Sequence, residues 1–183
     1  MPKKPLDQDI LAFWFTETQP NSWFKKDQAF DSEIERRFAG TVEDALASRF
    51  DHWANTCASC LALILVLDQF TRNIFRDNAR AFSGDNMALT LSLRCVECDY
   101  IAHPDENWRR FMLMPMMHSE DLAIQEASLP LFQTHASKST YEYAVAHHNI
   151  IARFGRFPHR NAILGRPSTD EEYLFLTQPG SSF

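Results

Sequence analysis

Apolar side chains recur every three or four residues along almost the whole chain, and this spacing restricts the fold more than any other feature. Phe30, Ile34 and Phe38 repeat at every fourth position between polar neighbours. Such a period places the three side chains on one face of an α-helix. Segment 57–70 is apolar almost throughout and predicts a central, buried helix. A chain with this pattern folds by packing helices against one another.

Prolines and capping residues predict where several helices begin and end. Pro115 predicts the end of a helix, because proline disfavours helical geometry in the residue before it. Ser119 predicts the N-cap of the next helix, with Glu120 and Asp121 in the first turn, where the helix dipole favours acids. Pro130 predicts a kink or an end in that helix.

Four further features complete the expected helix pattern. A first short helix, carrying Ile10, ends before residue 19. Gly155 predicts a left-handed C-cap, and a capping box from Ser168 to Glu171 predicts a last helix. The other expected helices span 87–98, 107–114 and 141–154.

The fold class predicted from these patterns is all-α, as one domain over residues 1–183. The chain has only 5 glycines in 183 residues, too few for a sheet protein rich in tight turns, and no segment is a convincing strand. Short connections between amphipathic helices favour stacked antiparallel helix hairpins. No repeat of fixed period is visible, although arrays of tetratricopeptide type normally show one.

Composition excludes several classes of partner. The formal net charge of -6 argues against a general nucleic-acid binder, which needs clustered basic charge. No run reaches the roughly 20 apolar residues of a membrane span. The basic start of the chain is followed by an apolar run too short for a secretory signal. We therefore expect a cytoplasmic protein without a membrane or nucleic-acid partner, and its oligomeric state stays open.

Three segments carry a resemblance to a known family. The chain resembles the bacterial family called domain of unknown function 924, which implies an all-helical, tetratricopeptide-like fold and no established activity. Asn149 departs from the family pattern, where an acid is expected, and Pro130 interrupts a helix that usually lacks proline. The resemblance rests on LDQFTRNIFR at 67–76, HSEDL at 118–122 and RFGRFPHRN at 153–161, with Gly165-Arg166, Phe13-Trp14-Phe15 and Trp23-Phe24.

Positive charge is concentrated near the end of the chain. Segment 147–166 contains four arginines and three histidines but no acid. The planar guanidinium group suits carboxylate and phosphate, so one interpretation is an anion-binding pocket for a phosphorylated or carboxylated small molecule. The alternative is that these arginines pair with Asp68, Glu120 and Asp121 and join helices together. Both interpretations can hold at once.

A polar row emerges from the apolar central helix. Asp68, Arg72 and Arg76 are spaced by four and share one helix face, beside Gln69 and Asn73. We expect this row to face a cleft and to meet the other motif segments there. The candidate ligand-binding residues are Asp68, Gln69, Arg72, Asn73, Arg76, His118, Glu120, Asp121, Arg153, Arg156, His159, Arg160 and Asn161.

The sequence identifies no catalytic residue, so whether the chain is an enzyme stays open. His118 or His159 could act as a general base, since imidazole titrates near neutral pH, but no nucleophile is evident. Phe154 and Phe157 are expected to anchor segment 153–161, called the motif loop below, in the core. The arginines of this loop are expected to turn toward the cavity. An enclosed pocket for a small anion is the favoured function. The alternatives are a helical-hairpin groove that binds a peptide, and a purely structural role.

No metal or cofactor is predicted. Cys57 and Cys60 form one C-x-x-C pair, and Cys95 and Cys98 form another, which on paper resembles a zinc site. Both pairs lie in apolar helical segments without glycine or proline nearby, so buried free thiols in a reducing compartment are favoured. The acids that follow His118 are adjacent in sequence, which places them poorly for a shared metal.

Overall fold

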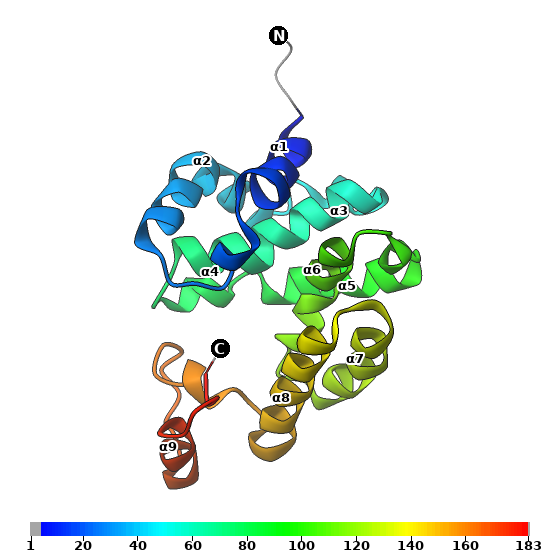
Figure 1. Ribbon diagram of the computed structural model, residues 1–183. Coiled ribbons are helices and arrows are strands. Elements are labelled where there is room, and N and C mark those ends of the chain that lie inside the picture. Colours follow the sequence, from blue (N-terminus) through cyan, green and yellow to red (C-terminus); the bar gives the residue numbers. More distant parts are fainter. Residues whose placement is uncertain (1–4, 183) are drawn as a thin grey trace.

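The computed structural model describes residues 5–182, and within that range the chain forms helices and turns without a strand (Figure 1). The predicted all-α fold is therefore confirmed. The α-helices are α1 (Leu6–Ala12), α2 (Gln28–Leu46), α3 (Cys57–Ile64), α4 (Thr71–Ile74), α5 (Asp85–Glu97), α6 (Glu106–Met117), α7 (Leu122–His135), α8 (Lys138–Phe154) and α9 (Asp170–Leu176).

The central helix passes through the middle of the fold, as the apolar segment predicts. It consists of α3, a π-helical turn at Leu65–Phe70, and α4, without a break between them. Every residue of the π-helical turn is buried. The stretch Cys57–Ile74 has the length and composition to cross a membrane, but 72% of it is buried inside the fold. It is thus packed as the core helix of a folded domain.

Helices α1, α2, α5 and α6 pack on this core helix, and the later helices follow beyond them. Helix α1 packs on α3, and α2 packs on the π-helical turn and α4. From α5 to α8, each helix packs on the next one along the chain, while α9 lies near the C-terminus, away from α7 (Figure 1). Aromatic rings join the core helix to α6. Trp14, just after α1, contacts Phe70 of the core helix and Phe111 of α6, each at 5.6 Å between ring centroids. The tetratricopeptide-like arrangement of hairpins stays a prediction.

Pro115 does not end a helix as predicted, and Pro130, which was expected to kink or end one, does not end it. Pro115 lies inside α6, which runs on to Met117, and Pro130 lies inside α7, which runs on to His135. A proline removes only one backbone donor, and every residue from Phe111 to Met117 is buried. Tertiary packing therefore outweighs the local preference at Pro115.

Several predicted helix starts are wrong by one to three residues, since α5, α6 and α8 begin earlier than expected and two N-caps are misplaced. Asp121, not Ser119, caps α7, and its carboxylate accepts the backbone N–H groups of residues 123 and 124. Ser119 instead accepts the N–H of Asp121 in the preceding turn. The last capping box pairs Thr169 with Glu172, one position later than expected. Gly155 does close α8 in a left-handed conformation, as predicted.

Candidate functional site

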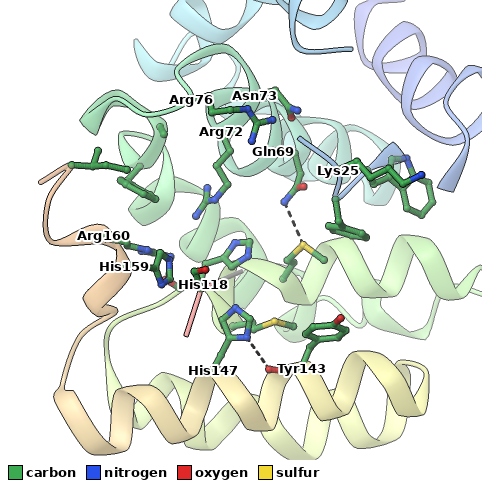
Figure 2. Close-up of a pocket in the computed structure, with 18 of the residues that line it drawn as sticks. Lys25, Gln69, Arg72, Asn73, Arg76, His118, Tyr143, His147, His159 and Arg160 are labelled. Carbon is green, nitrogen blue, oxygen red and sulfur yellow. Dashed lines mark hydrogen bonds between the residues drawn. The ribbon is translucent and has the colours of Figure 1, made fainter. Parts of the chain in front are cut away.

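A cavity, called the main pocket below, lies between three helix faces (Figure 2). It has a volume of about 530 Å³, which is within the range of small-molecule sites. Each face presents residues spaced by three or four, so each contributes one stripe of a helix. The stripes are Gln69, Arg72, Asn73 and Arg76; Arg110, Met114, Met117 and His118; and Thr140, Tyr143 and His147.

Two loops close the main pocket at opposite ends. Trp23, Phe24 and Lys25 line it from the loop before α2, and His159 and Arg160 line it from the loop after α8. Figure 2 shows Lys25 and Arg160 on opposite sides of the cavity. Residues from across the sequence therefore converge on one space.

The buried Asp68 and the partly buried His118 form a dyad at the wall of the main pocket. Nδ1 of His118 lies 2.7 Å from Oδ1 of Asp68, whose side chain is 1% exposed. Burial acts against ionisation of Asp68, but Arg72 and His118 outweigh it and hold the pKa of this carboxyl well below its usual range. An ionised carboxylate only accepts hydrogen bonds, so Nδ1 of His118 donates and Nε2 is left for the pocket.

Arg72 and Arg160 share the carboxylate of Asp85. Nη1 of Arg72 lies 2.9 Å from Oδ1 of Asp85, and Nη1 of Arg160 lies 3.3 Å from Oδ2. Arg160 also donates to the backbone carbonyl of His118 and lies between the rings of Phe82 and Phe157. Burial, with the nearby charge of Arg72, lowers its pKa to about 10. Both guanidinium groups remain charged at neutral pH.

Two further imidazoles line the main pocket, and both are neutral at pH 7. Burial lowers the pKa of His147 to about 3 and that of His159 to about 4, with smaller contributions from neighbouring cations. Nδ1 of His147 lies 2.8 Å from the carbonyl oxygen of Tyr143, so it carries the proton and donates.

Arg110 differs from the other arginines of the main pocket. Arg76 contacts Asp31 through two hydrogen bonds of 2.6 and 2.7 Å, whereas Arg110 has no carboxylate within 4.0 Å among residues 5–182. Its guanidinium group lies 4.5 Å from the ring centre of Phe24, and its Nε is buried without a hydrogen-bond partner. Burial lowers the pKa of Arg110 because the charged form loses water.

The structure brings together most of the predicted site residues from the central helix and some of those from the motif loops. Asp68 lies behind the wall of the main pocket, and the others line it. Besides Asp68, the residues brought together are Gln69, Arg72, Asn73, Arg76, His118, His159 and Arg160.

Other predicted site residues do not line the main pocket, so the expected convergence of all of them on one space is wrong. Arg153 pairs with Glu171, and Arg156 pairs with Glu172 at 2.7 and 2.8 Å. Both arginines therefore attach segment 153–161 to α9, which is a structural role, although the alternative weighed above named Asp68, Glu120 and Asp121 as the partners. Asp121 caps α7 instead of pairing with an arginine.

Glu120 and Asn161 organise the motif loop beside the pocket. Arg166 donates to both oxygens of Glu120 at 2.6 and 2.9 Å, and also to Oδ1 of Asn161. Glu120 lines a smaller cavity of about 200 Å³, which shares His118 and Arg160 with the main pocket. Phe157 is fully buried, as expected, whereas Phe154 is partly buried against Phe175.

Sequence reasoning missed Arg110, Tyr143 and His147. The signal was present on α6, because Arg110, Met114 and His118 recur every fourth residue. Arg110 lies in none of the three segments that carry the family resemblance. In the sequence it cannot be told from an ordinary charged residue on an amphipathic helix. Only the three-dimensional arrangement shows that no described carboxylate lies within 4.0 Å of this charge, although Glu106, one turn earlier on α6, still acts on it.

The four cysteines lie on α3 and at the end of α5, and they differ in burial. Cys60 and Cys95 are buried with 3.5 Å between their sulfur atoms, whereas Cys57 and Cys98 are partly exposed. All four are free thiols. Over residues 5–182, no group of three or more His, Cys, Asp or Glu side chains is arranged to hold a metal ion.

Comparison with known proteins agrees with this fold. The family model described as bacterial protein of unknown function (DUF924) matches residues 10–180. A solved structure of a protein of unknown function from Agrobacterium tumefaciens is similar at 37% identity, with a TM-score of 0.88, and the match covers 93% of this chain and 96% of that one. No curated protein matches. The chain belongs to the bacterial DUF924 family, whose function is unknown.

Proposed function

We propose that the main pocket binds a small anionic molecule that carries a carboxylate or a phosphate group. Arg110 is the observation that carries this proposal. It is a partly buried cation that lines the cavity, and no described carboxylate lies within 4.0 Å of it. Burying a charge without a partner is costly, so an anion from solution is the natural complement.

The charge balance within the main pocket supports an anion near Arg110. Arg72 and Arg160 are offset by Asp68 and Asp85, and Arg76 is offset by Asp31. Lys25 adds a second cation at the end closed by residues 23–25, where Phe24 stacks on Arg110. We therefore expect the anion to bind near Arg110 and Lys25 rather than near the arginines of segment 153–161.

The walls between the two ends favour a ligand with an apolar body. Trp23, Phe24, Met114 and Tyr143 line the cavity with rings and a thioether. Aromatic and sulfur surfaces bind flat or extended hydrocarbon well. A ligand with one anionic end and an apolar middle therefore fits better than a bare inorganic ion.

Isothermal titration calorimetry with adipate, benzoate, phenyl phosphate and inorganic phosphate tests this function. We expect at least one organic anion to bind more tightly than phosphate, and Arg110→Gln to weaken its binding about tenfold or more. Arg36→Gln is the matched control, because Arg36 pairs with Glu33 on an exposed face of α2. An equal loss of anion affinity in both variants, or no binding of any of these anions to the wild-type protein, would overturn the proposal.

A peptide-binding function is the second candidate, supported by exposed aromatic rings beside the main pocket. Phe24 is 55% exposed and Tyr143 is 56% exposed. Large exposed aromatic side chains are common at protein interaction sites. A peptide should then bind with a dependence on both rings, measured by titrating Phe24→Ala and Tyr143→Ala with a peptide panel. Binding of no peptide by the wild-type protein would exclude this candidate, whereas retained binding in both variants would show that the two rings do not form the binding site.

We also propose a cytoplasmic location and no nucleic-acid or membrane partner. Four free thiols are typical of a reducing compartment, and the net charge of -6 disfavours phosphate backbones. Fractionation of the native protein tests the location.

A further inference from the structure

We propose that the main pocket is an active site in which His118 is the general base for hydrolysis of an ester whose acyl group ends in a carboxylate. The inference rests on the proposed function, since Arg110 would hold the carboxylate. It adds a reaction, a substrate class and a catalytic residue to that binding site.

The first argument is the order of residues along α6. Arg110, Met114 and His118 follow one another at every fourth position and line the same cavity. At 1.5 Å per residue, the two ends of this row are separated by about 12 Å. A carboxylate at Arg110 would place an apolar chain over Met114 and a reactive group near His118. The row therefore indicates a substrate with an anion at one end and a reactive bond at the other.

The second argument is the fixed orientation of His118. Its ring donates from Nδ1 to the buried Asp68, and its backbone carbonyl accepts from Arg160 at 3.1 Å. Asp68 is in turn held by Gln69 and Arg72. The contact to Asp68 fixes the ring, and the contact to Arg160 fixes the end of α6 that carries it. This arrangement keeps Nε2 available to take a proton.

The third argument is permanent positive charge beside the imidazole. Arg72 lines the main pocket and contacts Asp68, and Arg160 lines it and contacts His118. Fixed cations stabilise the negative oxygen that forms when a carbonyl carbon is attacked. The base and the groups that stabilise an oxyanion therefore occupy the same end of the cavity.

The reaction needs only water as a second substrate. Nε2 of His118 takes a proton from water while the water oxygen forms a bond to the ester carbonyl carbon, and the carbonyl oxygen becomes negative. When this intermediate collapses, the C–O bond to the alcohol breaks. The alcohol oxygen receives the proton from Nε2, so the products are a carboxylic acid and an alcohol, and the imidazole is restored.

Mono-4-nitrophenyl adipate is a suitable probe, because its carboxylate and ester are separated by four methylene groups. 4-Nitrophenyl hexanoate has the same chain length without the charge. We expect kcat/KM for the adipate ester to exceed that for the hexanoate ester about tenfold. We also expect His118→Asn to lower kcat about 100-fold or more. His148→Asn, which removes an imidazole of α8 that does not line the pocket, should leave kcat unchanged.

Titration with adipate separates the two proposals. If His118→Asn binds adipate like the wild-type protein but no longer hydrolyses its ester, both proposals are supported. If the wild-type protein binds adipate but hydrolyses neither ester faster than the His118→Asn variant, the catalytic inference is overturned and the anion site stands. If adipate and the other anions fail to bind, both are overturned.

Asp68 is assigned as a positioning residue for His118. Asp68→Asn keeps the shape of the side chain but removes the charge that fixes the proton on Nδ1. We expect kcat for mono-4-nitrophenyl adipate to fall while KM and the affinity for adipate change little. A fall in adipate affinity without a change in kcat would contradict this role.

Discussion

The guanidinium group of Arg156 contacts both carboxylate oxygens of Glu172, with Nε and Nη2 at 2.7 and 2.8 Å. The carboxylate also accepts the backbone N–H of Thr169, which closes the capping box of α9. One carboxylate thus caps α9 and attaches the motif loop to it. Arg156, in the middle of the motif segment 153–161, therefore stabilises the fold instead of lining the main pocket.

This contact predicts a pH-dependent contribution to stability. The hydrogen bonds from Arg156, with those from the backbone, lower the pKa of Glu172 to about 2 from its ordinary 4.5. A lowered pKa stabilises the folded state above the unfolded pKa, and the contribution disappears as the pH falls through about 2. Glu172→Gln should lower the free energy of unfolding by about 2 kcal/mol at pH 7 and by far less near pH 2.

Urea denaturation at pH 7, 4 and 2.5 measures this difference. Glu171→Gln is the matched control, since Glu171 is 62% exposed and pairs with the partly exposed Arg153. It should change the free energy of unfolding by less than about 0.5 kcal/mol. A difference between Glu172→Gln and the wild-type protein that does not vary with pH would contradict the prediction.

Arg110→Met should raise stability while it weakens anion binding. Methionine retains the apolar contacts of the arginine stem and removes a partly buried charge without a described acidic partner. We expect a gain of about 1 kcal/mol in the free energy of unfolding, because residues kept for function are often not optimal for stability. Thermal denaturation without and with adipate gives both quantities. A less stable variant would show that Arg110 supports the fold.

Two glycines should respond in opposite directions to alanine. A Cβ on Gly84 would lie 2.2 Å from the carbonyl oxygen of Leu67, so Gly84→Ala must push the start of α5 away from the core helix. Overpacking of this kind costs about 1–3 kcal/mol. A Cβ on Gly40, an exposed residue inside α2, would meet nothing within 4 Å. Gly40→Ala should therefore stabilise the protein by about 0.5–1 kcal/mol, as chemical denaturation would show.

The four thiols should react with an alkylating agent in two groups. Cys57 and Cys98 are partly exposed, so pulsed alkylation followed by mass spectrometry should label them first. Cys60 and Cys95 are fully buried and should be labelled only when the protein unfolds. Equal protection of all four, lost on addition of a chelator, would instead indicate a shared metal ion.

The fold was predictable because its evidence is local. The period of Phe30, Ile34 and Phe38 places a helix, and the left-handed Gly155 ends one. The errors at Pro115 and Ser119 arose where buried packing and an alternative cap outweighed local preference.

The site was only partly predictable, because pairing is not local. Sequence alone does not tell whether an arginine forms an ion pair, as Arg156 does with Glu172, or forms none with the described acids, as is the case for Arg110. The row from Asp68 to Arg76 was placed correctly, since one helix carries it. The cavity also depends on how α6 and α8 face that row, and this is decided by the packing of the whole chain.

The π-helical turn at Leu65–Phe70 determines the direction in which the later residues of the core helix face around its axis. A π-helical turn holds about one residue more than an α-helical turn, so it acts as an insertion within an otherwise continuous helix. Each residue turns an α-helix by about 100°, so deleting one here would rotate everything beyond by that angle relative to α3. Arg72 and Arg76 would then leave the cavity while the apolar composition stayed nearly the same. The surplus residue thus sets the phase between the buried half of this helix and its polar half.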